Sequence, residues 1–315
     1  MNVITLDQIL NQNPAVTLLK RALSTDRLSH AYLFTGPKGV GKETTAYAFV
    51  FHLFCQKDPL SPCGVCVACK KISKETHPDV LKISPEKKEI KIDQIREIIN
   101  FLRYRPIEAK YKVILIQNAE RMNLEAANAL LKSLEEPPSY GIFILITENF
   151  TQLLPTVVSR SQVVRFHPLP KTTVYRVLTE RYGFEKQVSQ TLAEISQGSL
   201  GRALTIAEKG FLEELNSFVK AGFSNSPYLR FRVAERFASF NYQDLEVIFY
   251  LVLVWIWRSY LKRLIDYPYP EAFPEEIYPK EPYPAFSLIQ ETLQALDRYL
   301  NPELVFYRLF LKMFD

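Results

Sequence analysis

The chain has 315 residues, of which 47% are hydrophobic, a composition typical of a folded protein with two or three domains and not of a disordered chain. Its 39 lysines and arginines against 34 acidic residues give a net charge of +5, which permits a nucleic-acid partner without requiring one. The N-terminus lacks a basic segment followed by an apolar one, and the apolar stretch Phe249 to Trp257 is about half the ~20 residues of a membrane span. We therefore expect a cytoplasmic protein with no membrane association, in which this run forms a buried helix.

The first half of the sequence alternates short apolar runs with amphipathic stretches, which is the pattern of an α/β domain with a parallel sheet. A strand at 31–34 leads into a glycine-rich loop and a helix at 43–54. Four further strands and two further helices follow, with the strands predicted at 77–83, 112–116, 142–147 and 161–166 and the helices at 93–102 and 123–134. The order strand, glycine loop, helix and further strands is that of a P-loop domain.

Helical periodicity dominates the second half of the chain. Pro168 and Pro170 close the α/β region, because two prolines so close together interrupt both helix and strand. Further on, six prolines within 267–284 exclude a continuous helix and predict either a rigid extended connector or a simple long loop. We expect three parts, which are an α/β domain at 1–167, a small helical lid at 168–209 and an all-α domain at 210–315.

The glycine loop, GPKGVGKETT from Gly36, nearly matches the phosphate-binding pattern G-x-x-x-x-G-K-[ST]. Its glycines would let successive backbone N–H groups point at an anion, and Lys42 would reach the β and γ phosphates. However, Glu43 replaces the hydroxyl that normally binds Mg²⁺, and Thr44 is turned roughly 100° away along the helix. The sequence argues against ATP hydrolysis here and leaves ATP binding in doubt. The residues of this degenerate nucleotide site are Gly36, Lys38, Gly39, Gly41, Lys42, Glu43 and Thr44.

A working site of this kind also needs carboxylates at the end of a neighbouring apolar strand, one to hold Mg²⁺ and one to polarise the attacking water. The strand at 112–116 is followed instead by Gln117 and Asn118, which carry no charge. Glu120 lies further along and is interpreted as a solvated residue at a helix start. Two parts of the site are therefore altered together, which one accidental substitution would not produce.

All four cysteines of the chain lie close together, as Cys55, Cys63, Cys66 and Cys69. In a cytoplasmic chain a disulfide framework is not expected, whereas four thiolates at this spacing suit a tetrahedral Zn²⁺. An iron–sulfur cluster and free structural thiols are the alternatives. With four protein ligands the zinc would be structural and not catalytic. His52, one helical turn before Cys55, is an alternative ligand, although a histidine in this position more often packs against its neighbours.

Four segments resemble the clamp-loader subunits of bacterial DNA polymerase III and follow in that family's order across residues 1–205. They are HAYLFTG before the glycine loop, the four-cysteine insertion at 55–69, NALLKSLEEPP at 128–138, and Ser159-Arg160. The resemblance implies an AAA+ α/β domain, a helical lid and a C-terminal collar domain that joins subunits into a hetero-oligomeric ring. It also implies that the four cysteines are the zinc ligands.

Two kinds of subunit in this family share these motifs. The gamma/tau subunits are ATPases with an intact phosphate loop and Walker B residues, whereas delta-prime subunits have lost them. Glu43, together with Gln117 and Asn118 at the Walker B position, makes this sequence resemble the delta-prime kind.

Further positions are assigned by the resemblance. Ser159 and Arg160 correspond to the family's Ser-Arg-Cys motif, whose arginine finger reaches into the ATP site of the neighbouring subunit, and Ser161 replaces the cysteine. Thr147 falls near the polar sensor residue. Gly201 stands where an active subunit tends to have the arginine of the second sensor, and Arg202 is shifted by one position.

The resemblance implies a non-hydrolysing subunit that assists ATP-dependent loading of the sliding clamp onto primed DNA in the DNA polymerase III holoenzyme, with gamma/tau and delta subunits as partners. An active gamma/tau-type ATPase, in which Glu43 and Glu120 supply a metal site, is the alternative. A zinc-dependent DNA-binding protein that acts alone is a third possibility, but the net charge is modest and no basic stripe interleaved with aromatic residues stands out.

Overall fold

A five-stranded parallel sheet forms the centre of the N-terminal unit, in a computed structural model that describes residues 3–58, 60–86, 89–224, 226–265, 269–297 and 301–314. The strands stand in the order β2-β3-β4-β1-β5, so that β1 lies between β4 and β5. Their bounds are β1 (Ala31–Thr35), β2 (Val80–Ile83), β3 (Lys112–Ile116), β4 (Gly141–Thr147) and β5 (Gln162–Arg165). The five predicted strands are confirmed, although β2 begins three residues later than expected. It starts late because Asp79, in the turn before it, accepts the backbone N–H groups of Ile107, Glu108 and Ala109.

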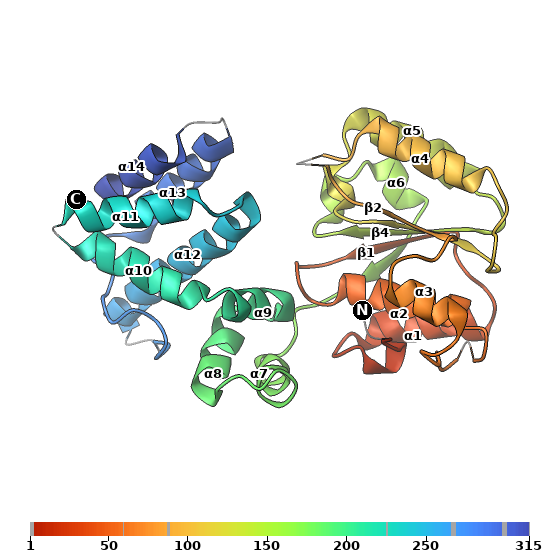
Figure 1. Ribbon diagram of the computed structural model, residues 1–315, viewed down its shortest axis with the longest axis horizontal. Helices are drawn as coiled ribbons and strands as arrows, with labels where there is room; N and C mark the ends of the chain where they lie inside the picture. The colour runs from red at the N-terminus through yellow and green to blue at the C-terminus, as the bar shows by residue number, and fades with distance from the viewer. Residues whose placement is uncertain are drawn as a thin grey trace. The chain divides into compact units, whose positions relative to one another are not determined.

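Helices cover both faces of this sheet (Figure 1). One face carries α1 (Asn13–Ser24), α2 (Lys42–Phe54) and α3 (Val67–Ser73), and the other carries α4 (Ile92–Leu102), α5 (Leu124–Glu135) and α6 (Pro155–Ser159). Short 3₁₀ helices lie at Leu6–Gln8, Ala119–Arg121 and Phe150–Gln152. Because both faces are covered, β3 and β4 are buried along their whole length, and their residues 113–116 and 142–146 are all apolar instead of alternating with polar ones.

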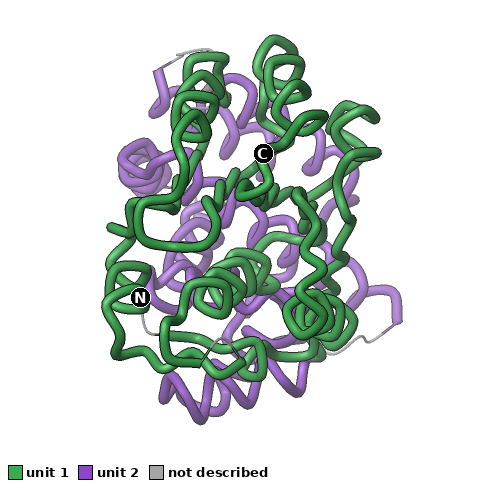
Figure 2. Tube along the Cα trace, turned by 90° about the vertical axis from the view of Figure 1, so that its right-hand side faces the viewer, with its two compact units in different colours: residues 1–170 green, residues 171–315 purple. Residues whose placement is uncertain are grey.

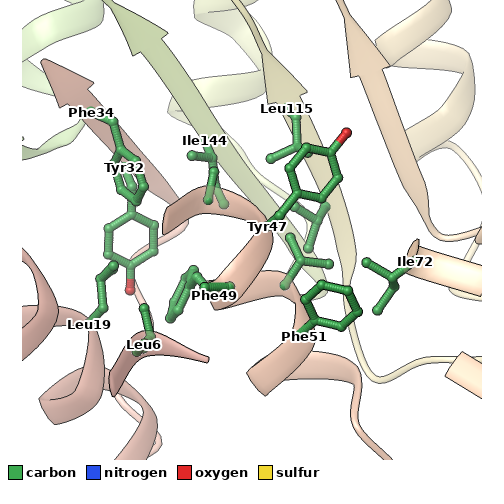
Figure 3. Close-up of a cluster of buried hydrophobic side chains, with 14 of the residues drawn as sticks. Leu6, Leu19, Tyr32, Phe34, Tyr47, Phe49, Phe51, Ile72, Leu115 and Ile144 are labelled. Atoms are coloured by element: carbon green, nitrogen blue, oxygen red, sulfur yellow. The ribbon is translucent and has the colours of Figure 1, made fainter. Parts of the chain in front are cut away.

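The two faces of the sheet bury separate sets of side chains. In β1, Tyr32 and Phe34 point toward α1 and α2, whereas Leu33 packs with the helices on the opposite face (Figure 3). The rings of Tyr32 and Phe49 meet edge to face at 5.3 Å between centroids. Each large apolar side chain buried in this way stabilises the fold by about 1.5–3 kcal/mol, so α2 is anchored firmly beneath the strand that precedes the glycine loop.

The parallel arrangement decides where the site lies. The carboxyl ends of parallel strands meet at one edge of the sheet, and ligands of open α/β sheets bind outside that edge. The loops after β1, β3 and β4 therefore bring the glycine loop, Gln117 and Thr147 to the same edge.

A second compact unit spans Lys171–Asp315, after a first unit of Met1–Pro170 (Figure 2). Its described residues contain eight α-helices and no strand. They are α7 (Lys171–Glu180), α8 (Lys186–Ile195), α9 (Leu200–Glu208), α10 (Phe211–Phe223), α11 (Pro227–Ala238), α12 (Tyr242–Ile265), α13 (Pro282–Asp297) and α14 (Pro302–Phe314). The further division of this unit into a lid and a collar domain at residues 209 and 210 stays a prediction.

Aromatic side chains fill the centre of the second unit. Phe218 on α10 stacks on Phe237 of α11 at 5.8 Å and contacts Phe310 of α14 at 4.8 Å between ring centroids. Gly222 allows α10 to approach α14 closely, since a Cβ there would lie 2.2 Å from the ring of Phe314. These contacts tie helices that are distant in sequence into one core.

The long apolar run from Phe249 to Trp257 lies inside α12, and most of it is buried as predicted. Trp257 at its end is an exception, with 41% of its surface exposed. Consecutive residues of a helix point to all sides, so a continuous apolar run also places residues on the face that solvent reaches. Within the part of the chain that the structure describes, none of the helices combines the length and the apolar character that a membrane crossing requires.

The proline-rich segment is more closely packed than an extended connector. Tyr278 is buried, and the indole N–H of Trp255 donates to the carbonyl of Glu276 at 3.0 Å. Pro282 and Pro284 stand in the first turn of α13, where helix N–H groups have no intrahelical partner and a missing one costs little. The prediction of a connector up to residue 284 is therefore wrong at its end, and residues 267 and 268 lie outside the described residues.

Candidate functional site

The glycine loop between β1 and α2 has the backbone of a phosphate loop. Gly36, Gly39 and Gly41 have φ angles of +150°, +74° and +101°, which residues with a Cβ rarely adopt. At Gly36 a Cβ would also lie 2.3 Å from the carbonyl oxygen of Phe166, at the end of β5. The loop is therefore shaped by its glycines and by the close approach of the chain after β5.

Gln12 holds this loop in place, although no sequence motif points to it. The side chain is buried, and its amide nitrogen donates to the carbonyls of Val40 at 3.3 Å and His167 at 2.7 Å. Its amide oxygen accepts the N–H of His167 at 3.0 Å. One amide thus joins the glycine loop to the segment that follows β5.

Lys42 is directed back at its own loop. The ammonium group donates to the carbonyl of Pro37 at 2.7 Å and also to that of Gly36, and the residue is only 6% exposed. Burial lowers the pKa of Lys42 to about 8, against the opposing effect of the charges of Glu148 and Glu120. Lys38 is exposed on the loop, and Thr44 is half-buried on α2.

The two altered parts of the site contact each other. The side-chain amide of Gln117, at the end of β3, donates to the carboxylate of Glu43 in the first turn of α2. The ammonium of Lys82 on β2 lies 3.3 Å from the same carboxylate and 3.5 Å from Glu75. A direct amide–carboxylate contact, with a lysine as counter-ion, therefore joins the end of β3 to the start of α2. In an intact site, Mg²⁺ and its ligands would connect these two elements. Lys82 was not predicted, because its position on β2 carries no motif.

We expect the contact between Glu43 and Gln117 to stabilise the α/β unit by about 1 kcal/mol, less than a buried charged hydrogen bond because the Glu43 side chain is 46% exposed. Urea unfolding of Glu43→Ala, Gln117→Ala and the double variant would measure this coupling energy. Asn118→Gly combined with Glu43→Ala is the control, since glycine tolerates the left-handed backbone at Asn118. The control pair should show additive losses of unfolding free energy. If the losses from Glu43→Ala and Gln117→Ala also add within about 0.3 kcal/mol in the double variant, the contact does not contribute to stability.

Two further polar residues lie at this edge of the sheet. Asn118 has a φ of +49°, and its amide nitrogen lies 3.5 Å from a carboxylate oxygen of Glu120. Glu120 stands in the first turn of the 3₁₀ helix at Ala119–Arg121, as predicted for a helix-start residue, but it is half-buried and its other carboxylate oxygen has no hydrogen-bond partner, so it is not fully solvated. Thr147, at the end of β4, is buried and accepts the N–H of Asn149 at 3.2 Å.

Gly201 and Arg202 belong to α9 in the second unit. The guanidinium of Arg202 lies 4.0 Å from the ring centroid of Tyr250 and donates to the carbonyl of Ser196 at 3.4 Å. In this structure the arginine of the predicted second sensor region is therefore used in packing between α9 and α12.

Arg160 directly follows α6 and is about one third exposed. Its guanidinium forms an ion pair with Glu135 at the end of α5, at 2.7 Å, and donates to the carbonyl of Thr156 at 3.1 Å. Ser159 is exposed and its hydroxyl donates to the same carbonyl, and the hydroxyl of Ser161 donates to the carbonyl of Val157. An exposed ion pair of this kind contributes about 0–1 kcal/mol, so it holds the guanidinium without preventing its release.

The four cysteines form a cluster that could hold a metal ion. Their sulfur atoms all lie within 4.8 Å of one another. A tetrahedral zinc with Zn–S bonds of about 2.3 Å requires sulfurs about 3.8 Å apart, so only a small contraction is needed. Cys69 is fully buried and Cys63 is partly exposed. The cluster closes the insertion that connects α2 to α3.

Backbone N–H groups point at these sulfurs. The N–H groups of Cys63, Cys66 and Cys69 each donate to the sulfur of the preceding cysteine in the cluster, at 3.4 to 3.5 Å. Contacts from the N–H groups of Val65 and Cys66 lower the pKa of Cys63 to about 6, which favours the thiolate that a metal binds.

His52 is not part of this cluster. The ring nitrogen Nε2 accepts the backbone N–H of Leu6 at 3.2 Å, and the side chain is buried in the core below the sheet. The histidine therefore packs, as the sequence favoured, and the donor set consists of the four thiols.

A model of the family described as DNA polymerase III, delta subunit, matches residues 11–170, about half of the chain. The chain belongs to this family. It is 37% identical over 185 residues to the DNA polymerase III subunit delta' of Bacillus subtilis, covering 58% of this chain and 54% of that protein. It is 33% identical over 211 residues to the tau/gamma subunit of Haemophilus influenzae, covering 65% of this chain and 30% of that protein. The chain thus spans less than two thirds of the length of these relatives.

The fold of this family member agrees with a solved structure. A DNA polymerase III gamma subunit-related protein from Thermotoga maritima matches it with a TM-score of 0.51 at 23% identity, covering 95% of this chain and 97% of that one. The predicted fold class is therefore confirmed: an α/β P-loop domain with a parallel sheet, followed by an all-α C-terminal region.

Proposed function

We propose that this protein is a non-hydrolysing, delta-prime-type subunit of the DNA polymerase III clamp loader. It assists ATP-dependent loading of the sliding clamp onto primed DNA and supplies Arg160 to the ATP site of a neighbouring ATPase subunit. The observation that carries the proposal is the contact between Glu43 and Gln117. Both residues stand where an intact site has ligands for Mg²⁺, and each satisfies the other instead.

This arrangement disfavours ATP hydrolysis in two ways. Mg²⁺ neutralises the charge that develops on the transferring phosphoryl group, and neither a hydroxyl after Lys42 nor a carboxylate at Gln117 is present to hold it. Glu43 also places a negative charge close to where a triphosphate would lie, which repels the nucleotide. The glycine loop therefore serves to hold α2 against the sheet and not to bind a substrate.

Arg160 is the group that would take part in catalysis, at a site belonging to another subunit. A guanidinium supplied in trans stabilises the charge of the phosphoryl transition state. Arg160 meets the requirements of such a group, because its backbone follows a helix anchored in the core while its guanidinium is about one third exposed. Gamma/tau and delta subunits are the proposed partners, and the clamp and primed DNA are reached through the assembled complex.

Zinc is the metal that the four cysteines fit. Four thiolates in a closed cluster match a structural Zn²⁺ site, and the N–H groups directed at the sulfurs stabilise the thiolate form. Bound zinc would crosslink the insertion at 55–69. No open coordination position would remain for a reaction at the metal.

The test is reconstitution with gamma/tau-type and delta subunits, the sliding clamp and primed DNA. We expect clamp loading to require this protein, and we expect the protein alone to hydrolyse no ATP. Lys42→Ala should leave loading and the ATPase rate of the complex within about twofold of wild type. If the pure protein turned over ATP near ~1 s⁻¹ and lost that activity in Lys42→Ala, it would instead be an active gamma/tau-type ATPase.

A further inference from the structure

We propose that Glu135 is a positioning residue for the arginine finger, Arg160. The inference rests on the proposed function and adds to it the residue that orients the finger before a neighbouring subunit is engaged. It starts from the ion pair between the two side chains, at 2.7 Å.

The backbone of Arg160 is fixed on both sides. Before it, Val157 on α6 is fully buried in the same core cluster as Leu134 of α5. After it, β5 begins at Gln162, which is paired with Tyr32 of β1. The Cα of Arg160 is therefore held between a helix anchored by Val157 and the sheet, and only its long, flexible side chain still has to be oriented.

Two acceptors orient this side chain. Glu135 contacts one terminal nitrogen, and the carbonyl of Thr156 accepts from the other at 3.1 Å. Together they hold the plane of the guanidinium between α5 and α6. The planar fork of arginine makes its contacts with phosphate directional, so the orientation of this plane matters for the finger in a way that it does not for a lysine.

The location of Glu135 points to the same role. It is the last residue of α5, where the partial negative charge of the helix end disfavours a carboxylate, and the guanidinium of Arg160 compensates both charges. The preceding residue, Leu134, is buried. The end of α5 is therefore anchored, and the backbone from which the Glu135 side chain extends is fixed in position.

The ion pair leaves the finger able to act. Arginine has five N–H donors, and the contacts with Glu135 and Thr156 use two of them. The Arg160 side chain is 35% exposed, so an incoming phosphate can reach it. Because an exposed ion pair is weak, Glu135 raises the population of the oriented finger by a few fold and does not lock it.

The test compares Glu135→Ala, Glu135→Gln and the neighbouring Glu136→Gln in the reconstituted complex. We expect Glu135→Ala to slow the single-turnover phase of ATP hydrolysis that depends on Arg160 about three- to fivefold, with the ATP concentration for half-maximal rate unchanged. Glu135→Gln, which keeps a hydrogen-bond acceptor, should lose no more than about twofold. Glu136→Gln is the matched control and should behave as wild type. Because Glu135 acts through Arg160, Arg160→Ala and Arg160→Ala with Glu135→Ala should have equal rates.

Other outcomes separate this inference from the proposed function. If Arg160→Ala abolishes stimulation while Glu135→Ala is unchanged or faster than wild type, Glu135 does not position the finger and the proposed function still stands. An equal loss from Glu135→Ala in the presence and absence of Arg160 would mean a merely structural role and would also overturn the inference. If Arg160→Ala has no effect, both proposals fail. Thermal unfolding of each variant confirms that it is folded, which is expected for Glu135→Ala because the Glu135 side chain is 47% exposed.

Discussion

Replacing Arg160 with alanine is expected to lower the rate of ATP hydrolysis by about 10³-fold at the one neighbouring site that this arginine faces. Arginine fingers supplied in trans are worth ~10³ to 10⁵ in rate, and we take the lower end of that range as the expected loss. Other ATP sites of the complex would keep their own fingers. Single-turnover hydrolysis in the reconstituted complex is therefore the measurement, and it should show the loss of one fast phase and not a uniform slowing.

Arg160→Lys is the matched control for charge. Lysine keeps the positive charge but loses the planar fork, so we expect it to recover only a small part of the lost rate. Neither variant should change the free energy of unfolding by more than about 1 kcal/mol, because the ion pair with Glu135 is exposed. A complex that hydrolyses ATP and loads clamps normally with Arg160→Ala would show that this residue is only a surface partner of Glu135.

Removal of the metal is the second change with a large expected effect. The purified protein should contain one zinc per chain, and Cys69→Ser, at the fully buried ligand, should release it. Structural zinc sites in small domains contribute about 10–16 kcal/mol to folding. Even about 5 kcal/mol of that amount would lower the Tm of the α/β unit by about 10–20 °C, since 1 kcal/mol corresponds to about 2–4 °C in a domain of this size.

Two controls define the metal site. His52→Gln should retain one zinc per chain, because the imidazole contacts the backbone of Leu6 and not the cysteines. Chelation of the metal from the wild type should reproduce the Tm loss of Cys69→Ser. Full zinc content in Cys69→Ser, or iron with visible absorption in place of zinc, would contradict the zinc assignment.

Local sequence patterns predicted most of the secondary structure elements and the motif residues of the sites. The continuous apolar runs within 112–116 and 142–147 predicted buried parallel strands, because a strand covered on both faces presents apolar residues to both sides. The spacing of the cysteines predicted a cluster, because residues that are close together in one short insertion cannot lie far apart in space. The sequence also showed that Glu43 and Gln117 depart from an active site.

Only the tertiary structure showed that these two residues contact each other and share Lys82. It also placed Glu135 against Arg160 and revealed Gln12 as the residue that joins the glycine loop to the end of β5. In each case the partners stand on different elements, and their meeting depends on strand order, register and helix packing. The spacing of apolar residues along a helix or strand indicates which face a side chain occupies. It carries no information about which residue of another element lies opposite that side chain.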